Sequence, residues 1–221
     1  MAATNQPFGL LARWHPSGQA RSNAYENVLL SGMNVPIYYG TPVKLVIGSG
    51  GAIAGVTVPT GQMVVQPVAA TTDPFIGSFA GVEYTDLNGR RQYSKFWTAS
   101  TSLYAGTQAL VYLWDDPENV YEIAFDGALN TGTNLYQFYG KQAVFTSADL
   151  GSGTAPAGNA VPIGQSAQRA SATLTSTGAQ GQLLIVSSFG LSSSTTQISD
   201  AFPTQYVKVA RHQFRNPQTS L

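Results

Sequence analysis

Short runs of β-branched and aromatic residues, each bounded by Gly or Pro, follow one another from Ala24 onward. Residues 37–39 and 43–47 form two such runs, and residues 206–209 form another near the end of the chain. Runs of this length and composition are typical of β-strands. No segment keeps apolar residues at the 3.6-residue period of an amphipathic helix. The pattern therefore predicts a mainly β fold, an antiparallel β-barrel or sandwich.

The strongest local signal is a β-hairpin over residues 81–97. Asn88 and Gly89 tolerate the positive φ angles of a tight turn, and β-forming residues alternate with polar ones on both sides of them. On the first strand Val82 and Tyr84 would share one face, because successive side chains of a strand point to opposite sides.

Two further hairpins are predicted from the same kind of pattern. In residues 109–127, the Asp-Asp-Pro-Glu stretch at 115–118 is the expected turn between two β-forming flanks. In the last third, residues 172–174 are expected to pair with residues 183–186 across a Gly-containing turn. Both hairpins would join strands that are close in sequence.

The first 24 residues differ from the rest of the chain. They mix Pro, Gly and Arg with isolated apolar residues and show neither helical nor strand periodicity, so residues 1–24 are predicted to form an extended N-terminal arm. Phe8 and Trp14 would expose large apolar surfaces to water, so we expect the arm to dock, either on a neighbouring molecule or back on its own domain. The sequence leaves both positions open.

Residues 25–221 are expected to form one β-rich domain or two small β subdomains. Within them, residues 128–170 are rich in Gly, Ala, Asn, Thr and Ser and predict an irregular insert, with an apolar island that fits a strand or a short helix. A single all-β domain can reach the length of 221 residues, so length does not decide between one domain and two.

Charge is sparse and balanced. Charged residues make up 10% of the chain, against about 25% in typical soluble domains. The 11 Lys and Arg cancel the 11 Asp and Glu, so there is no net positive field and we expect no nucleic-acid partner. No stretch approaches the roughly 18 apolar residues that span a bilayer, so no membrane association is expected. Low charge favours association with copies of the chain or with a partner, although an ordinary low-charge β domain would share this composition.

The sequence offers little for catalysis. It has no cysteine, no serine in a G-x-S-x-G motif, and two histidines, His15 and His212, which lack the helical i, i+4 spacing of zinc proteases. Asp115, Asp116 and Glu118 bring three carboxylates together as a cation site would, but a hairpin turn explains them more simply. We therefore expect no enzyme activity, no catalytic or metal site and no cofactor, and keep a hydrolase built from distant carboxylates only as a third hypothesis.

Four segments in the first 127 residues resemble those of a known protein family. They are PFGLLARWHPSGQARSNAY (7–25), IYYGTPVKL (37–45), FAGVEYTDLNGRRQYSKFW (79–97) and VYLWDDPENVYEIAFDG (111–127). With QGQLLIVSSFG and DAFPTQYVKVARHQF near the end, the chain resembles the tailed-bacteriophage capsid decoration proteins, also called cement or minor capsid proteins. Residues 128–170 lie outside the resemblance.

The resemblance implies a structural role on the virion. A protein of this kind binds the outer surface of the major capsid lattice and cements neighbouring capsomers against the internal pressure of the DNA. The chain would be assembled in the host cytoplasm and reside on the outer face of the head. Its partners would be the major capsid protein and copies of itself, with a trimer favoured and a dimer possible.

The resemblance also assigns a role to the arm, which would clamp the capsid. Phe8, Leu11 and Trp14 are then the candidate apolar anchors, and Arg13 and Arg21 are candidate contacts to capsid carboxylates. The alternative function is a glycan- or receptor-adhering projection on the virion. Its basis is the 11 Tyr, 10 Phe and 3 Trp, which would stack on sugars if displayed in a row, although core packing accounts for most of them.

Overall fold

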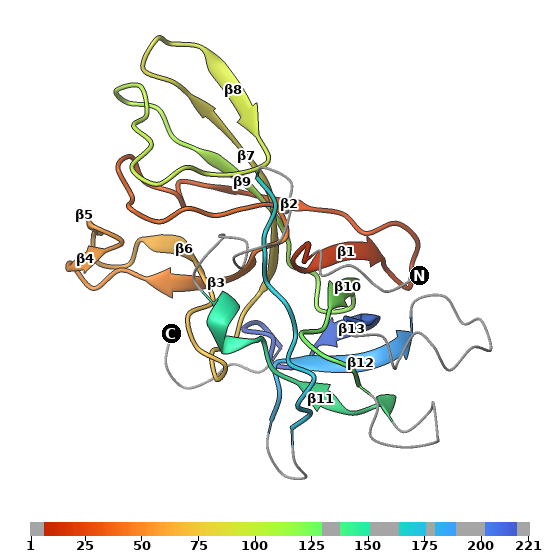
Figure 1. The fold of residues 1–221 in the computed structure, drawn as a ribbon. Coiled ribbons are helices and arrows are strands. Elements are labelled where there is room, and N and C mark those ends of the chain that lie inside the picture. The colour runs from red at the N-terminus through yellow and green to blue at the C-terminus, as the bar shows by residue number, and fades with distance from the viewer. Residues whose placement is uncertain (1–6, 130–137, 151–163, 176–179, 189–201, 216–221) are drawn as a thin grey trace.

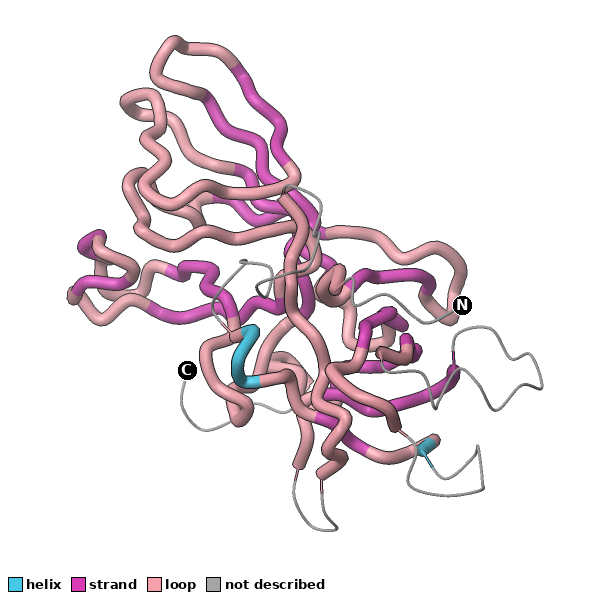
Figure 2. The backbone as a smooth tube through the Cα atoms, in the orientation of Figure 1, coloured by secondary structure: helices cyan, strands magenta, loops and turns pink. Residues whose placement is uncertain are grey.

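The computed structural model describes residues 7–129, 138–150, 164–175, 180–188 and 202–215. The strands of these residues form two main antiparallel sheets in a sandwich-like arrangement that does not close into a barrel, which confirms the predicted mainly β class (Figures 1 and 2). No helix in the described residues is long and apolar enough to cross a membrane.

The larger sheet has six strands. Its order is β2-β9-β7-β3-β6, with β8 paired to β7 outside this path. A small two-stranded hairpin, β4–β5, continues from the ends of β3 and β6. The bounds are β2 (Asn23–Glu26), β3 (Pro42–Ile47), β4 (Ala52–Ile53), β5 (Val56–Thr57), β6 (Met63–Pro67), β7 (Gly77–Thr85), β8 (Arg91–Ser94) and β9 (Leu110–Trp114).

The smaller sheet has five strands, in the order β1-β10-β13-β12-β11. All of its pairings are antiparallel. A short 3-10 helix, η2 (Ser147–Asp149), follows strand β11 in the chain. The bounds are β1 (Leu11–Trp14), β10 (Val120–Ala124), β11 (Gln142–Ala143), β12 (Leu183–Ser188) and β13 (Thr204–Val209).

Each sheet has its own hydrophobic core. Phe79, Trp97 and Leu113 are among the fully buried side chains on the six-stranded sheet, and Tyr121 and Phe145 are among those on the five-stranded sheet. The chain passes directly from one core to the other, because Phe75 packs in the second cluster and the next residue, Ile76, in the first.

The hairpin predicted over residues 81–97 is confirmed as β7–β8, with Thr85 opposite Arg91. Its turn differs from the prediction. Among the two turn residues only Gly89 has a positive φ, of 75°, and the loop is closed by a hydrogen bond from Asp86 N to Arg90 O (2.9 Å). The Asp86 carboxylate also accepts hydrogen bonds from the Asn88 and Arg90 amides (both 2.9 Å), so a three-residue loop with one left-handed residue replaces the tight two-residue turn.

The other two predicted hairpins are wrong. Strand β9 pairs with β2 and β7, whereas β10 pairs with β1 and β13, so residues 115–119 cross from one sheet to the other instead of forming a hairpin turn. Strand β12 pairs with β11 and β13, and residues 172–174 belong to no strand. In both cases the strands pair with others than the predicted partner, and the local pattern is equally compatible with either pairing. The closing strand predicted at 206–209 is confirmed as part of β13.

The segment expected to be an arm lies, from residue 7 onward, on the chain's own sheets. Leu10 is fully buried in the second core, β1 pairs with β10, and β2 pairs with β9. Between these strands a tight turn is closed by hydrogen bonds between His15 and Gly18 (2.9 and 2.8 Å). Of the two positions left open by the sequence, the structure has the one in which the segment folds back. Residues 1–6, and the parts of the expected insert at 130–137 and 151–163, lie outside the described residues.

Candidate functional site

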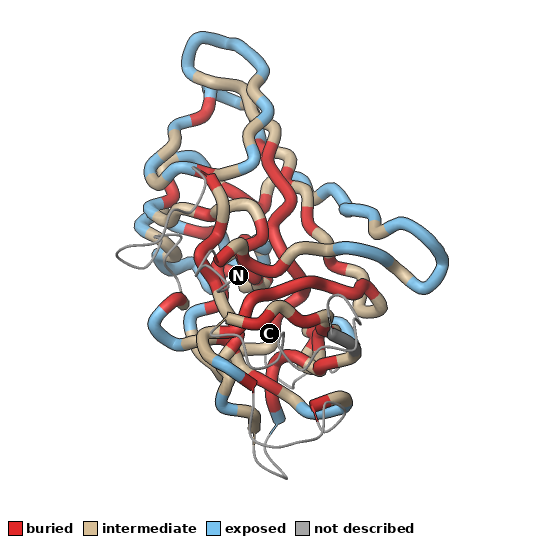
Figure 3. The backbone as a smooth tube through the Cα atoms, turned by 45° about the vertical axis from the view of Figure 1, so that its right-hand side comes forward, coloured by how far each residue is buried: buried red, intermediate tan, exposed pale blue. Residues whose placement is uncertain are grey.

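Three segments extend from the body of the molecule and end in exposed residues. They are the β7–β8 hairpin, the β4–β5 hairpin with the adjoining ends of β3 and β6, and the turn between β1 and β2 (Figure 1). Figure 3 shows the β7–β8 hairpin at the top of the molecule, with an exposed tip above the buried first part of β7. We call these three segments the projections.

The β7–β8 projection carries the most exposed apolar side chains. Leu87 at its tip is 65% exposed, and Tyr93 on β8 is 63% exposed. Tyr104 is 49% exposed and lies beside the hairpin, since its amide donates a hydrogen bond to Thr85 O (3.0 Å). Exposed large apolar groups that gather in this way mark surfaces for protein contact.

The other two projections carry the same kind of residue. Ile47 and Met63 are directly opposite each other on β3 and β6 and are 39% and 44% exposed. Trp14, at the end of β1, is 45% exposed. Each projection therefore exposes at least one large apolar side chain to solvent.

Charged groups near these apolar residues are mostly paired within the chain. On the outer face of the six-stranded sheet, Tyr112 donates a hydrogen bond to the Glu83 carboxylate (3.2 Å), which is also ion-paired with Arg91. Tyr93 lies beside Tyr112, with ring centroids 6.2 Å apart. Desolvation and the Glu83 carboxylate raise the pKa of the Tyr112 hydroxyl. This surface is aromatic, and its carboxylate is already neutralised.

The five predicted contact residues are placed differently from one another. Leu11 and Arg13 are both neighbours of buried Glu122 on the five-stranded sheet, since Leu11 is opposite Glu122 in register and Arg13 is ion-paired with it. Trp14 follows on the same strand, opposite Val120 across a register shift. The remaining two lie apart from this group: Phe8 is half-buried and its carbonyl accepts a hydrogen bond from Gln165, and Arg21 is exposed on the far side of the turn.

Sequence reasoning missed the apolar residues of the other two projections. Leu87 had a recognisable signal, because it is a large apolar residue within the otherwise polar turn stretch of the hairpin. Ile47 and Met63 had none, since a strand residue with this pattern is normally buried.

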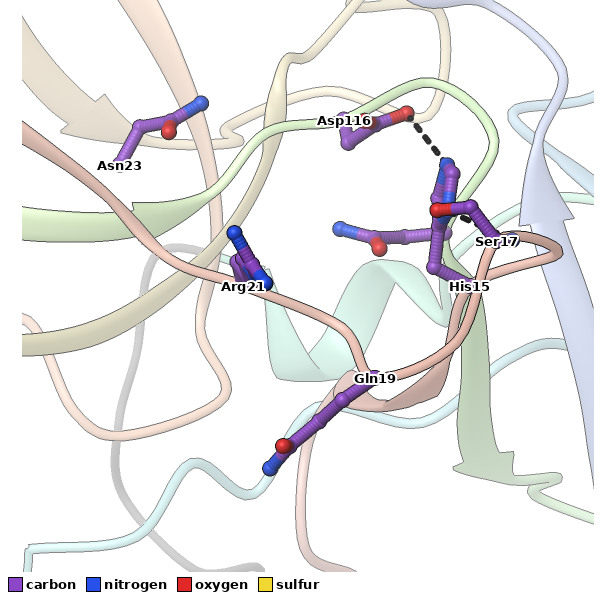
Figure 4. Close-up of a pocket in the computed structure, with 7 residues that line it drawn as sticks. His15, Ser17, Gln19, Arg21, Asn23 and Asp116 are labelled. Atoms are coloured by element: carbon purple, nitrogen blue, oxygen red, sulfur yellow. Dashed lines mark hydrogen bonds and ion pairs between the residues drawn. The ribbon is translucent and has the colours of Figure 1, made fainter.

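A polar pocket of about 330 Å³ lies between the β1–β2 turn and the crossing segment 115–119 (Figure 4). The His15 ring bridges two of its walls, with Nδ1 2.6 Å from Ser17 Oγ and Nε2 3.4 Å from Asp116 Oδ1. Gln19 is directed away from the other labelled side chains. The lining residues are His15, Ser17, Gln19, Arg21, Asn23, Asp116 and Asn119.

The buried Asp115 carboxylate next to this pocket has partners of its own. It accepts hydrogen bonds from Asn23 Nδ2 (2.6 Å) and from the Tyr25 hydroxyl, while its backbone carbonyl accepts one from His212 Nε2 (2.8 Å). Burial, together with the hydrogen bond to Asp115, raises the pKa of Tyr25. This carboxylate therefore fixes the crossing segment between the two sheets.

The other two carboxylates of the acidic stretch point to separate partners. Asp116 accepts a hydrogen bond from the Glu118 amide (2.8 Å), and Glu118 itself binds Lys208 (2.7 Å) and Arg215 (2.6 Å). In the residues that the structure describes, no group of three His, Cys, Asp or Glu side chains is placed to hold a metal ion.

The chain matches no protein-family model, no curated protein and no solved structure.

Proposed function

We propose that the chain is a structural protein of a tailed-phage head that binds the outer surface of the major capsid lattice and cements neighbouring capsomers. The observation that carries this proposal is that six of the seven large apolar residues exposed in the described part of the chain lie on or beside the three separate projections, the seventh being Phe214. A protein that binds one soluble partner needs one patch, whereas a protein that bridges subunits of a lattice needs several contact points directed to different neighbours.

Each contact alone would be weak. Fully burying a large apolar side chain stabilises by about 1.5–3 kcal/mol, so Leu87, Tyr93 and Tyr104, each roughly half exposed, would contribute on the order of 3 kcal/mol together. That is less than the cost of bringing two molecules together, estimated at about 4–15 kcal/mol. When three such contacts form on a fixed lattice, the cost of association is met only once, because after the first contact the other two form within the same complex at a high effective concentration, and binding becomes stable.

The charge distribution is consistent with this mode of binding. Glu83 is paired with Arg91, Glu118 with Lys208 and Arg215, and Glu122 with Arg13. Since these groups are satisfied internally, contacts at the projections would be formed mainly by apolar and aromatic side chains. In this proposal Trp14 keeps its predicted role as an anchor, while Arg13 acts within the chain.

Cryo-electron microscopy of the virion that carries the chain tests the proposal. We expect density that bridges adjacent capsomers, with the β7–β8 tip, the Ile47–Met63 end and Trp14 each against the capsid, and with copies of the chain in contact, a trimer being favoured. Density confined to the tail or to fibre tips would contradict the proposal and favour the adhesion function.

A binding assay with variants tests the same point in solution. Leu87→Asp places a charge in the apolar contact and should weaken co-sedimentation with heads that lack the chain by at least about tenfold, which corresponds to about 1.4 kcal/mol. Thr72→Asp adds the same charge at an exposed site outside the projections and should bind as the wild type does. Wild-type binding by Leu87→Asp, Met63→Asp and Trp14→Asp alike would rule out the projections as the binding surface.

A further inference from the structure

Strand β8 is an open edge of the six-stranded sheet. Among the described strands it pairs with β7 alone, and the carbonyl of Arg90, just before it, accepts a hydrogen bond from Asp86 N (2.9 Å) on the β7 side. Backbone groups that point to one side of a strand recur at every second residue, so those of Arg91 and Tyr93 point away from β7. Both residues are exposed, and on that side their backbone groups bond to no residue that the structure describes. This edge can therefore accept another strand.

Strand β2, at the other end of the row β2-β9-β7-β8, is open in the same way. The Asn27 amide, directly after the strand, donates a hydrogen bond to Ala109 O (3.2 Å) on the β9 side. By the same alternation, the backbone groups of Ala24 and Glu26 point away from β9. Both residues are exposed, and these groups have no hydrogen bond within the described part of the chain.

The directions of the two open edges fit each other. Strand β2 is antiparallel to β9, β9 to β7, and β7 to β8, so β2 and β8 run in opposite directions. When copies of the chain are related by rotation about an axis parallel to the strands, β8 of one copy meets β2 of the next in antiparallel orientation. The sheet then continues from copy to copy with its alternation unbroken, and a head-to-tail contact of this kind closes into a ring if the rotation permits.

The two edges also present their exposed side chains on the same face. A row of directly opposed residues crosses the sheet from one edge to the other, and its members are Glu26, Leu110, Glu83 and Tyr93. Directly opposed residues of neighbouring strands point to the same side of a sheet. Joining the edges therefore keeps these side chains on one continuous face.

One register makes the opposed side chains complementary. It places Glu26 of one copy opposite Arg91 of the next, and because the strands are antiparallel, Ala24 is then opposite Tyr93. Opposite charges and a small residue facing a large ring are both favourable cross-strand pairs. Glu26 has no ion pair within the described residues. Pairing two β8 edges instead would gather Arg91 and Lys95 of both copies, and like charges disfavour that arrangement.

We propose that copies of the chain join edge to edge, with β8 of one copy paired to β2 of the next, and that this contact builds a closed ring. The Arg91 side chain is 75% exposed, so it bridges Glu83 of its own chain and Glu26 of the next copy. The proposal rests on the two edges alone and holds whether or not the projections bind a capsid. Leu87, at the hairpin tip, lies outside the paired residues and stays available to another partner.

Protection against pairing is the competing interpretation of these edges. Charged side chains on an edge strand can serve to keep other strands away. The two interpretations differ in one measurable respect, because a chain with protected edges stays monomeric.

Sedimentation velocity of the full chain over a range of concentrations tests the proposal. We expect an oligomer whose dissociation constant rises at least about tenfold in Ala24→Arg, since the new side chain lies opposite Tyr93 and beside Arg91 of the next copy. Thr72→Arg adds the same charge at an exposed position outside both edges and is the matched control. Leu87→Asp should also associate as the wild type does, so this proposal and the capsid-binding proposal can fail separately.

Hydrogen exchange locates the contact. In the oligomer the backbone N–H groups of Glu26 and Tyr93 should exchange at least about tenfold more slowly than in Ala24→Arg, because they are then bonded across the edge. Ala24 is exposed, so this variant should unfold at the wild-type temperature.

Three results would overturn the inference. One is a wild-type chain that remains monomeric at about 100 µM. Another is an oligomer whose association Ala24→Arg leaves unchanged. The third is an oligomer in which the N–H groups of Glu26 and Tyr93 exchange as fast as in the variant.

Discussion

Gly77 is the first residue of β7, and its backbone lies directly against the end of β9. We expect that no side chain is tolerated at this position. Its φ is 153°, a conformation that L-residues rarely adopt. A Cβ atom at this position would lie 1.7 Å from Trp114 O and 2.7 Å from Trp114 C, both of them backbone atoms that cannot rotate away. Gly77→Ala must therefore separate the two strands, which are in register at Ser78 and Trp114.

The expected cost is the sum of two effects. Backbone strain for a residue with a side chain in such a conformation is on the order of 1–3 kcal/mol. Separating the strands weakens about two hydrogen bonds of the ladder, each with a net contribution of about 1 kcal/mol. The total, roughly 3–5 kcal/mol, is a large part of the 5–15 kcal/mol by which domains are commonly stable. For a domain of this size it corresponds to a fall in melting temperature of about 6–20 °C.

Urea unfolding followed by tryptophan fluorescence measures this cost, because Trp97 is 1% exposed and will report loss of the core. Gly51→Ala is the control, since its Cβ would meet only Ser49 Oγ, at 3.9 Å, and it should unfold close to the wild type. A Gly77→Ala variant within about 0.5 kcal/mol of the wild type, the usual scatter for surface substitutions, would show that β7 and β9 do not cross as closely as described.

Three further predictions concern the buried polar groups. Burial lowers the pKa of His212 below its usual 6.5, so the unfolded chain binds this proton more readily than the folded chain, and the free energy of unfolding should fall as the pH drops below about 6.5. Urea unfolding at pH values from about 7 to 5 should show this fall, and His212→Gln should make it smaller. Arg169→Met leaves Asp149, whose side chain is 3% exposed, without its ion-pair partner and should lower the free energy of unfolding by about 3–5 kcal/mol. A second change, Asp149→Leu, removes the buried charge and should restore most of this loss, so equal stability of the single and double variants would contradict the prediction. Tyr25→Phe removes a hydrogen bond to buried Asp115 and should cost about 1.5–3 kcal/mol by chemical unfolding, and ultraviolet titration should show native Tyr25 ionising at a higher pH than an exposed tyrosine.

Features set by neighbouring residues were predictable from the sequence. The β7–β8 hairpin was predicted from Asn88 and Gly89, which are adjacent in the chain, and the Asp86 carboxylate that closes the loop in the structure lies three residues before Gly89. The exchange of β10 into the other sheet was not predictable in this way. Residues 111 and 113 and residues 121 and 123 have the same inward alternation, but they point into two different cores.

The candidate site shows the same limit. Exposed Trp14 was identified because a large aromatic residue stood in a Pro- and Gly-rich segment. The polar pocket was not, because it exists only where the β1–β2 turn, about a hundred residues earlier in the chain, lies against the crossing segment. Polar groups held by distant segments carry no local pattern.

The strands of the two sheets come from different ranges of the sequence, and this determines the order in which the sheets can form during translation. All strands of the six-stranded sheet lie between Asn23 and Trp114, whereas the five-stranded sheet joins β1 to β10 and β10 to β13, which ends at Val209. During synthesis the first sheet has all its strands once Trp114 has left the ribosome, while the second lacks β13 until Val209 has been added. We expect a nascent protein with one finished sheet and a β10 that is paired with β1 on one edge but still lacks β13 on the other, so the step most exposed to misassembly comes after the first sheet has formed.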